Sequence, residues 1–285
     1  MNGSLTGHVG IVIGATSGIG AATARRLAAD GATVVLAGRR RAEGAALAAE
    51  LGPGASFVGA DVTRDGDVAA VVAHAVARHG RVDSLVNCAG TTGMAGPVTD
   101  ADPDELARMT ALHAGGVLSG IRHAAPVMVA QGAGSIVSIA SVAGRLGGWT
   151  GAAYAASKAA VLQLTRSAAV DLGEHGVRVN CVSPGPVLTG VFAKGAGIDP
   201  AVADRTAGAL EPAFRAVLER WVPVRGAMVP DDVAAAVVWL AGPGSRFVNG
   251  HDLVVDGGLS AGRPLSAALA ELPELGAALM AAAGP

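Results

Sequence analysis

Gly14-Ala-Thr-Ser-Gly18-Ile-Gly20 lies between an apolar run, Val9–Ile13, and an Ala-rich stretch that predicts a helix over Gly18–Asp30. Glycines between a strand and a helix permit a tight turn, in which backbone N–H groups and the positive helix end approach a pyrophosphate. An ordinary strand-to-helix turn is the alternative, since the chain contains 42 glycines. We predict that this turn binds a dinucleotide through Gly14, Ser17, Gly18, Ile19 and Gly20.

The same alternation of short β-branched runs and Ala-rich stretches continues along the chain. Further strands are predicted over Thr33–Ala37, Ser56–Ala60, Ser84–Asn87, Ser135–Ile139, Val177–Val182 and Leu253–Val255. Helices are predicted over Arg41–Leu51, Asp65–His79, Asp104–Gln131, Ala152–His175 and Asp231–Leu240. Apolar strands separated by helices are typical of a parallel sheet covered on both faces. The pattern therefore predicts an α/β, Rossmann-type, doubly wound sheet of about seven strands, in one domain over residues 1–262.

Two stretches depart from this alternation. Residues 190–225 contain several Gly and Pro around a short Ala-rich helical segment, and we predict an irregular insertion that serves as a substrate lid. Residues 263–285 follow the last strand as a C-terminal extension rich in Ala, Leu and Pro. This extension is either a helix packed on a neighbouring subunit or a frayed tail.

Composition excludes several classes of protein. The net charge of −2 gives no basic field for nucleic acid or a membrane surface. Cys88 and Cys181 are the only cysteines, which suggests a reducing compartment, and the N-terminus has no signal-peptide pattern. We predict a cytoplasmic protein with neither nucleic-acid nor membrane partners. The scattered histidines predict no metal site, and the absence of a Gly-x-Ser-x-Gly elbow argues against a hydrolase.

The end of the second strand bears on the choice of dinucleotide. It reads Ala37-Gly38-Arg39, with Gly38 where an acidic residue would bind the ribose 2′-OH of NAD. Arginine at this place accommodates a 2′-phosphate. We therefore predict that Arg39 favours NADP(H), with NAD(H) as the alternative, although arginines here could also form the solvated start of a helix.

Tyr154 and Lys158 are four residues apart in a strongly helical stretch, so they share one helix face. A lysine charge close to a phenol lowers the pKa of the phenol and suits it to exchange a proton with an alcohol. Ser141 ends the fifth predicted strand, and its hydroxyl could bind a carbonyl oxygen. A surface Tyr–Lys pair and a serine that simply ends a strand are the alternatives.

These motifs, in their order, resemble the short-chain dehydrogenase/reductase family over about residues 5–258. The resemblance extends to Asp61-Val62, Asn87-Cys-Ala-Gly90, Pro184-Gly185-Pro-Val-Leu-Thr189 and Asp256-Gly257-Gly258. It implies that cofactor is also bound by Asp61, Val62, Asn87, Ala89, Gly90, Tyr154, Lys158, Pro184, Gly185, Val187 and Thr189. Cys88 stands where the family usually has Asn.

His113 is the second departure from the family pattern. It aligns with an Asn that holds a water in the family's proton relay. Histidine also binds water and moves protons, so we predict that His113 replaces that Asn as a catalytic residue beside Ser141, Tyr154 and Lys158. The alternative is a neutral histidine satisfied by a backbone carbonyl, with the relay rerouted or lost.

The resemblance implies an enzyme that transfers a hydride between NAD(P)(H) and a ketone or secondary alcohol, and a homotetramer. We predict an apolar small-molecule substrate bordered by Met94, Trp149, Phe192 and Trp221. The competing hypothesis is a non-catalytic dinucleotide sensor of the same fold. The acid/base residues argue against it, because sensing requires none.

Overall fold

The computed structural model describes residues 5–93, 95–195 and 197–283. Its centre is a parallel sheet of seven strands in the order β3-β2-β1-β4-β5-β6-β7. The strands are β1 Val9–Ile13, β2 Thr33–Gly38, β3 Ala55–Gly59, β4 Ser84–Asn87, β5 Gly134–Ile139, β6 Val177–Pro184 and β7 Asp252–Val255. This order confirms the predicted doubly wound sheet. All strands are parallel, and the order in which they are added switches from one side of β1 to the other at β4.

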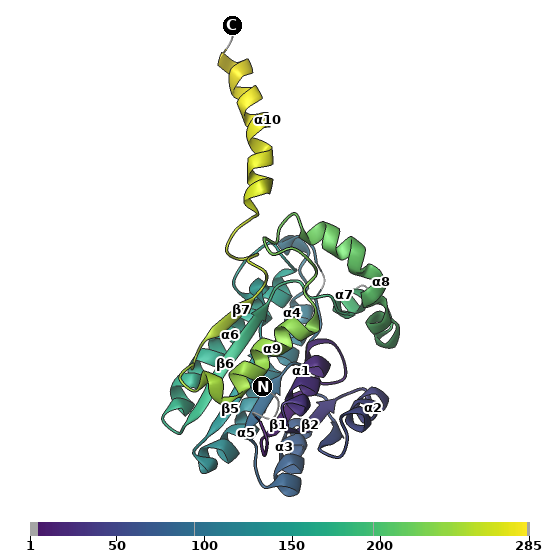
Figure 1. Cartoon of the computed structure of the whole chain (residues 1–285), viewed down its shortest axis with the longest axis vertical. Coiled ribbons are helices and arrows are strands. Elements are labelled where there is room, and N and C mark those ends of the chain that lie inside the picture. Colours follow the sequence, from purple (N-terminus) through teal and green to yellow (C-terminus); the bar gives the residue numbers. More distant parts are fainter. Residues whose placement is uncertain (1–4, 94, 196, 284–285) are drawn as a thin grey trace.

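Helices cover both faces of the sheet (Figure 1). The helices are α1 Gly18–Ala29, α2 Arg41–Leu51, α3 Asp65–His79, α4 Pro103–Thr110, α5 Gly116–Gln131, α6 Ala152–Gly173, α7 Val191–Gly195, α8 Pro200–Leu218, α9 Pro230–Ala241 and α10 Leu265–Ala283. The buried residues of α3, α5 and α6 form one core with the sheet. Those of α1, α2 and α9 form a second core on the opposite face.

The predicted helix over Asp104–Gln131 is interrupted by a π-helical turn. Ala111–Gly115 forms this turn between α4 and α5 and contains His113. A single π-turn inside a helix is frequently found at a functional site.

Residues 190–225 are more regular than predicted, whereas their role as a lid stays a prediction. Most of this stretch is helical, in α7 and in the 19 residues of α8. Pro200 begins α8, where its missing N–H has no intrahelical partner to lose. The end of α8 is fixed because Leu218 packs with Val142 and Leu259. Tertiary packing therefore outweighs the unfavourable Pro212 inside the helix.

The C-terminal extension forms a helix, α10, that projects away from the rest of the molecule (Figure 1). Its apolar side chains Leu265, Leu269, Leu279 and Met280 are exposed. By length and composition it is the one helix of the described chain that could cross a membrane, although a single such helix is weak evidence. The two interpretations given for this extension, an intersubunit helix and a frayed tail, stay open.

Candidate active site

One cavity of about 670 Å³ opens at the carboxyl ends of the strands. Its walls come from the segments that follow β1 to β6, which is where ligands of doubly wound sheets bind. The predicted residues that line it are Gly14, Ser17, Gly18, Ile19, Arg39, Asp61, Val62, Ala89, Gly90, Ser141, Trp149, Tyr154, Lys158, Pro184, Gly185, Val187 and Thr189. The sequence motifs therefore converge on one site.

The turn after β1 is built on close backbone contacts. Gly14 has a φ of 88°, and a Cβ there would lie 2.5 Å from the backbone nitrogen of Ala89. A Cβ on Gly20 would lie 2.1 Å from the carbonyl oxygen of Gly14. Only glycine fits at either position, so the turn stays tight and its N–H groups remain open to an anion. Gly20 shapes the turn from behind and is not among the lining residues, contrary to its predicted contact.

The adenosine end of a dinucleotide would meet the ends of β2 and β3. Gly38, Arg39 and Arg40 line the cavity at the end of β2. The Asp61 carboxylate accepts hydrogen bonds from the Thr63 N–H at 3.0 Å and from the Thr63 hydroxyl at 2.8 Å. The backbone bond from Thr63 is the largest of the causes that lower the pKa of Asp61. Asp61 is therefore a fixed anion, as recognition of a base or ribose requires.

Asn87 differs from its predicted role, because it lies behind the cavity wall and is not among the lining residues. Its side-chain amide donates to the Ser138 hydroxyl at 3.3 Å. A Cβ on Gly120 would lie 2.3 Å from Asn87 Oδ1, so α5 packs directly against this side chain. In the structure Asn87 joins β4, β5 and α5, and Ser138 stands where the family commonly has Asn.

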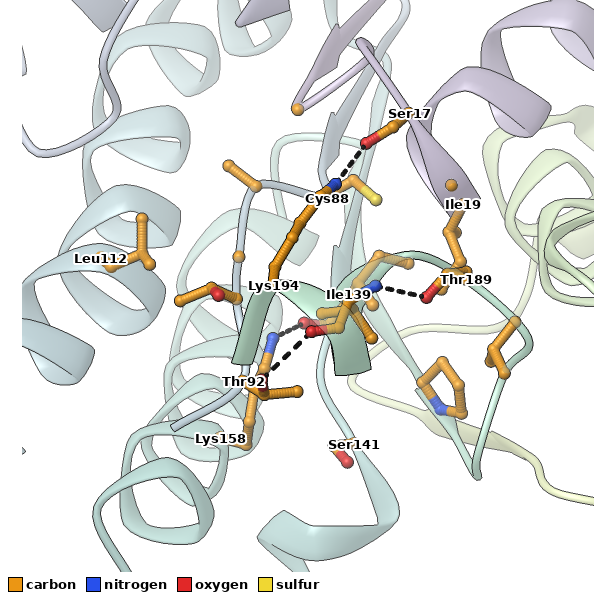
Figure 2. A pocket seen from close by; sticks show the side chains of 18 of the residues that line it. Ser17, Ile19, Cys88, Thr92, Leu112, Ile139, Ser141, Lys158, Thr189 and Lys194 are labelled. Carbon is orange, nitrogen blue, oxygen red and sulfur yellow. Dashed lines mark hydrogen bonds between the residues drawn. The ribbon is translucent and has the colours of Figure 1, made fainter. Parts of the chain in front are cut away.

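Ser141, Tyr154 and Lys158 meet on one wall of the cavity. Ser141 and Tyr154 both line the cavity, and the Ser141 hydroxyl acts on the phenol to lower its pKa. Lys158 Nζ lies 5.7 Å from the centre of the Tyr154 ring and donates to the Ile139 carbonyl oxygen at 2.8 Å (Figure 2). A Cβ on Gly144 would lie 2.8 Å from the carbonyl carbon of Lys158. This close approach holds the loop after β5 against α6, and with it Ser141.

In the protein alone, burial controls the ionisation of this pair. Burial raises the pKa of Tyr154, and the opposing effect of the Ser141 hydroxyl is smaller. Burial also lowers the pKa of Lys158 to about 8. In the protein alone, desolvation is therefore the dominant effect on Tyr154, and the prediction that Lys158 lowers the pKa of Tyr154 stays a prediction for the cofactor-bound enzyme.

His113 is buried beside Tyr154, and their rings meet edge to face with centroids 5.4 Å apart. Its Nε2 accepts a hydrogen bond from the Thr91 N–H at 3.3 Å, so the neutral ring carries its proton on Nδ1. Nδ1 then donates to the Ser157 hydroxyl at 2.8 Å, and Ser157 donates to the Tyr154 carbonyl oxygen at 2.7 Å. Burial lowers the pKa of His113 to about 2.

This arrangement bears on the predicted relay. His113 is not among the lining residues of the cavity, and both of its ring nitrogens bond to protein groups. With a pKa of about 2 the imidazole stays neutral at working pH, so it cannot carry an additional proton. The long bond from Thr91 would have to open before Nε2 could accept from a water. The relay through His113 stays a prediction.

The predicted substrate residues are placed unequally. Trp149 lines the cavity, whereas Trp221 does not and reaches it only through Trp149. The two indoles meet edge to face, with centroids 5.4 Å apart. Met94 lies outside the described residues, and only the backbone of Phe192 is described, in α7. Within the described residues no three His, Cys, Asp or Glu side chains are grouped to hold a metal ion.

Several lining residues were not predicted. Cys88 lines the cavity, and burial raises the pKa of its thiol to about 12, so it is no nucleophile. Arg40, Lys194 and Asp204 also line it. Lys194 is one of only two lysines in the chain, a signal that sequence reasoning could have used. Asp204 gives no such signal, because its place depends on how α8 packs.

Comparison with known proteins agrees with this geometry. The profile of a family described as enoyl-(acyl carrier protein) reductase matches residues 14–260. Momilactone A synthase of Oryza sativa subsp. japonica is 42% identical over 90% of this chain and 91% of its own. (+)-Borneol dehydrogenase 1 of Salvia officinalis is 37% identical over 91% of this chain and 96% of its own. Tropinone reductase-like 1 of Erythroxylum coca is 35% identical over 91% and 93%.

Proposed function

The chain belongs to the short-chain dehydrogenase/reductase family and is an NAD(P)-dependent oxidoreductase, and from that premise we propose that it interconverts a ketone and a secondary alcohol with Tyr154 as proton donor and acceptor. The observation that carries this proposal is that Ser141, Tyr154 and Lys158 line the same cavity as the phosphate-binding turn. One cavity thus holds an acid/base group and a place for the dinucleotide.

Each residue of the site has its own role in the proposed reaction. A bound nicotinamide supplies or accepts the hydride. Ser141 orients the substrate oxygen, and Tyr154 gives that oxygen its proton or removes it in the oxidative direction. Lys158 is placed by its bond to the Ile139 carbonyl oxygen and would also bind the nicotinamide ribose. The tight turn at Gly14, together with Asp61 at the adenosine end, fits an extended dinucleotide.

NADP(H) is the proposed cofactor. Gly38 leaves no carboxylate at the end of β2, where one would repel a 2′-phosphate, and Arg39 and Arg40 line the cavity beside it. A strong preference for NADH over NADPH in binding or turnover would contradict this assignment.

The proposed substrate is an apolar, cyclic ketone or alcohol. Trp149 gives the cavity a flat apolar wall supported by Trp221. Two relatives are named for borneol and tropinone, which are small ring compounds. We also propose one catalytic domain over residues 1–262, with 190–225 as its lid, in a cytoplasmic homotetramer.

Borneol with oxidised cofactor and tropinone with reduced cofactor are the first substrates to assay, with NADP(H) and NAD(H) compared. Tyr154→Phe removes the phenolic hydroxyl and keeps the ring against His113. We expect it to lower kcat about 100- to 10,000-fold and to leave cofactor affinity near the wild-type value. Ala156→Ser, an exposed change on the same helix, is the control. Wild-type protein that binds cofactor but turns over no ketone or alcohol would favour a sensor.

A further inference from the structure

A cluster of charges joins the lid to the phosphate-binding turn. Asp204, on α8, accepts hydrogen bonds from Lys194 Nζ at 2.6 Å and from Arg40 Nη1 at 2.7 Å. Lys194 Nζ also lies 3.3 Å from the Ser17 hydroxyl. Figure 2 shows the Lys194 side chain reaching across the cavity to Ser17. Arg40 donates to the Thr16 carbonyl oxygen at 2.9 Å. Lys194 therefore ties the lid to Ser17 directly, and Arg40 links Asp204 of the lid to Thr16 of the turn.

The close approach of the lid is built into the backbone. A Cβ on Gly190 would lie 2.5 Å from Asp204 Oδ1 and 2.7 Å from the Ala203 carbonyl oxygen. Glycine at this position therefore allows the first turns of α8 to lie directly on the segment that follows β6. This contact fixes where the Asp204 carboxylate stands, at the edge of the cavity.

The Asp204 carboxylate occupies a place suited to an anion. Burial favours its neutral form, but the hydrogen bonds from Lys194 and Arg40 outweigh burial and lower its pKa. All three side chains are between a fifth and a quarter exposed, so the cluster is reachable from the cavity. A phosphate monoester such as a 2′-phosphate carries more charge than a carboxylate and offers three strong acceptor oxygens, and the two phosphates of a pyrophosphate bridge carry one negative charge each.

We propose that Lys194 and Arg40 are cofactor-binding residues that Asp204 holds in place until the dinucleotide arrives. Lys194 binds the pyrophosphate, because its Nζ lies at Ser17 in the turn that such a group approaches. Arg40 binds the adenosine 2′-phosphate, because it lies at the end of β2 beside Gly38 and Arg39. Each phosphate displaces the carboxylate from its cation, and α8 then loses its tie to the turn. The Arg40 part rests on the proposed use of NADP(H).

Calorimetric titration with NADPH and with NADH separates the two roles. NADH shares the pyrophosphate but lacks the 2′-phosphate. We expect Lys194→Gln to lower the affinity for both cofactors about tenfold and to leave the ratio of the two affinities unchanged. Arg40→Gln should lower the affinity for NADPH about tenfold and change the affinity for NADH little. Asp204→Asn keeps the side chain's shape and removes its charge, so both cofactors should bind several-fold tighter.

Two further variants serve as controls. Lys194→Arg keeps the charge and should retain most of the affinity, which a loss caused by a damaged lid would not. Arg215→Gln removes a positive charge from the same lid helix, where Arg215 pairs with Glu211, and should leave both affinities unchanged. Thermal unfolding of each variant checks that it is folded.

The proposal is overturned if Lys194→Gln binds both cofactors normally, if Arg40→Gln affects them equally, or if Asp204→Asn weakens both. The last result would mean that Asp204 serves only to hold the lid. Wild-type protein that binds NADH as tightly as NADPH would instead refute the proposed cofactor preference and leave the role of Lys194 at the pyrophosphate to be decided by its own variant.

Discussion

Lys158 is required by the proposed mechanism, yet its burial predicts that it destabilises the folded protein. The side chain is 5% exposed, and desolvation lowers its pKa from 10.5 to about 8. A lysine whose pKa is lower in the folded state binds its proton less tightly there than in the unfolded chain. Between these two pKa values the unfolded state therefore holds more protons, and stability rises as the pH rises.

The size of the effect follows from the shift. Each pKa unit corresponds to about 1.4 kcal/mol, so at pH 7 the charged Lys158 lowers the free energy of unfolding by about 3 kcal/mol. At pH 9.5 the folded protein has lost this proton and most of the unfolded chain has kept it, which leaves a penalty of about 1.4 kcal/mol. Lys158→Met keeps the length of the side chain and removes the charge, so it removes the penalty at both pH values.

Urea unfolding of the wild type and Lys158→Met, at one protein concentration and at pH 7 and 9.5, measures this difference. We expect Lys158→Met to be the more stable protein at pH 7, and its advantage to shrink by about 2 kcal/mol at pH 9.5. Titrating groups that do not interact with Lys158 cancel in the comparison. An advantage that does not change with pH, or a less stable variant whose deficit stays constant, would refute the argument that desolvation of the ammonium controls this site.

Three further predictions concern neighbouring residues. His113→Asn loses the two ring bonds to Thr91 and Ser157 and should destabilise the protein by about 1–3 kcal/mol in urea unfolding, and an unchanged pH profile of kcat would argue against a relay through His113. Gly38→Asp should shift the ratio of NADPH to NADH affinity toward NADH at least tenfold, whereas Gly38→Ala, which meets the same Thr16 methyl, should lower both affinities alike. Trp221→Ala should raise KM for apolar ketones several-fold and leave cofactor affinity unchanged.

Strand periodicity predicted the sheet well because a parallel strand covered on both faces needs a continuous apolar run. β1, β4 and β6 are buried at almost every position, and their bounds follow the apolar runs of the sequence within a residue or two. The lid was predicted poorly for the opposite reason. The helix α8 contains Pro212 and is stabilised by packing of Leu218 on Val142, a contact between residues far apart in the chain.

The site divides in the same way. Glycines at the turn and the spacing of Tyr154 and Lys158 are local features, and the structure places them on the cavity as expected. The ionisation of Tyr154 was predicted from its spacing to Lys158, whereas in the protein alone burial raises the pKa of Tyr154. Spacing shows which charges are near each other but not how much water they lose, and here the loss of water is the larger effect.

By itself, then, the sequence determined the parallel sheet, the tight turn at Gly14 and the helical pairing of Tyr154 with Lys158, because each depends on residues that are neighbours along the chain. Only the tertiary structure decided which side chains are desolvated and which distant charges meet. It turned both nitrogens of His113 toward Thr91 and Ser157, and it brought Asp204 of the lid between Arg40 and Lys194. Burial and long-range contacts arise only when elements pack, and no local pattern encodes them.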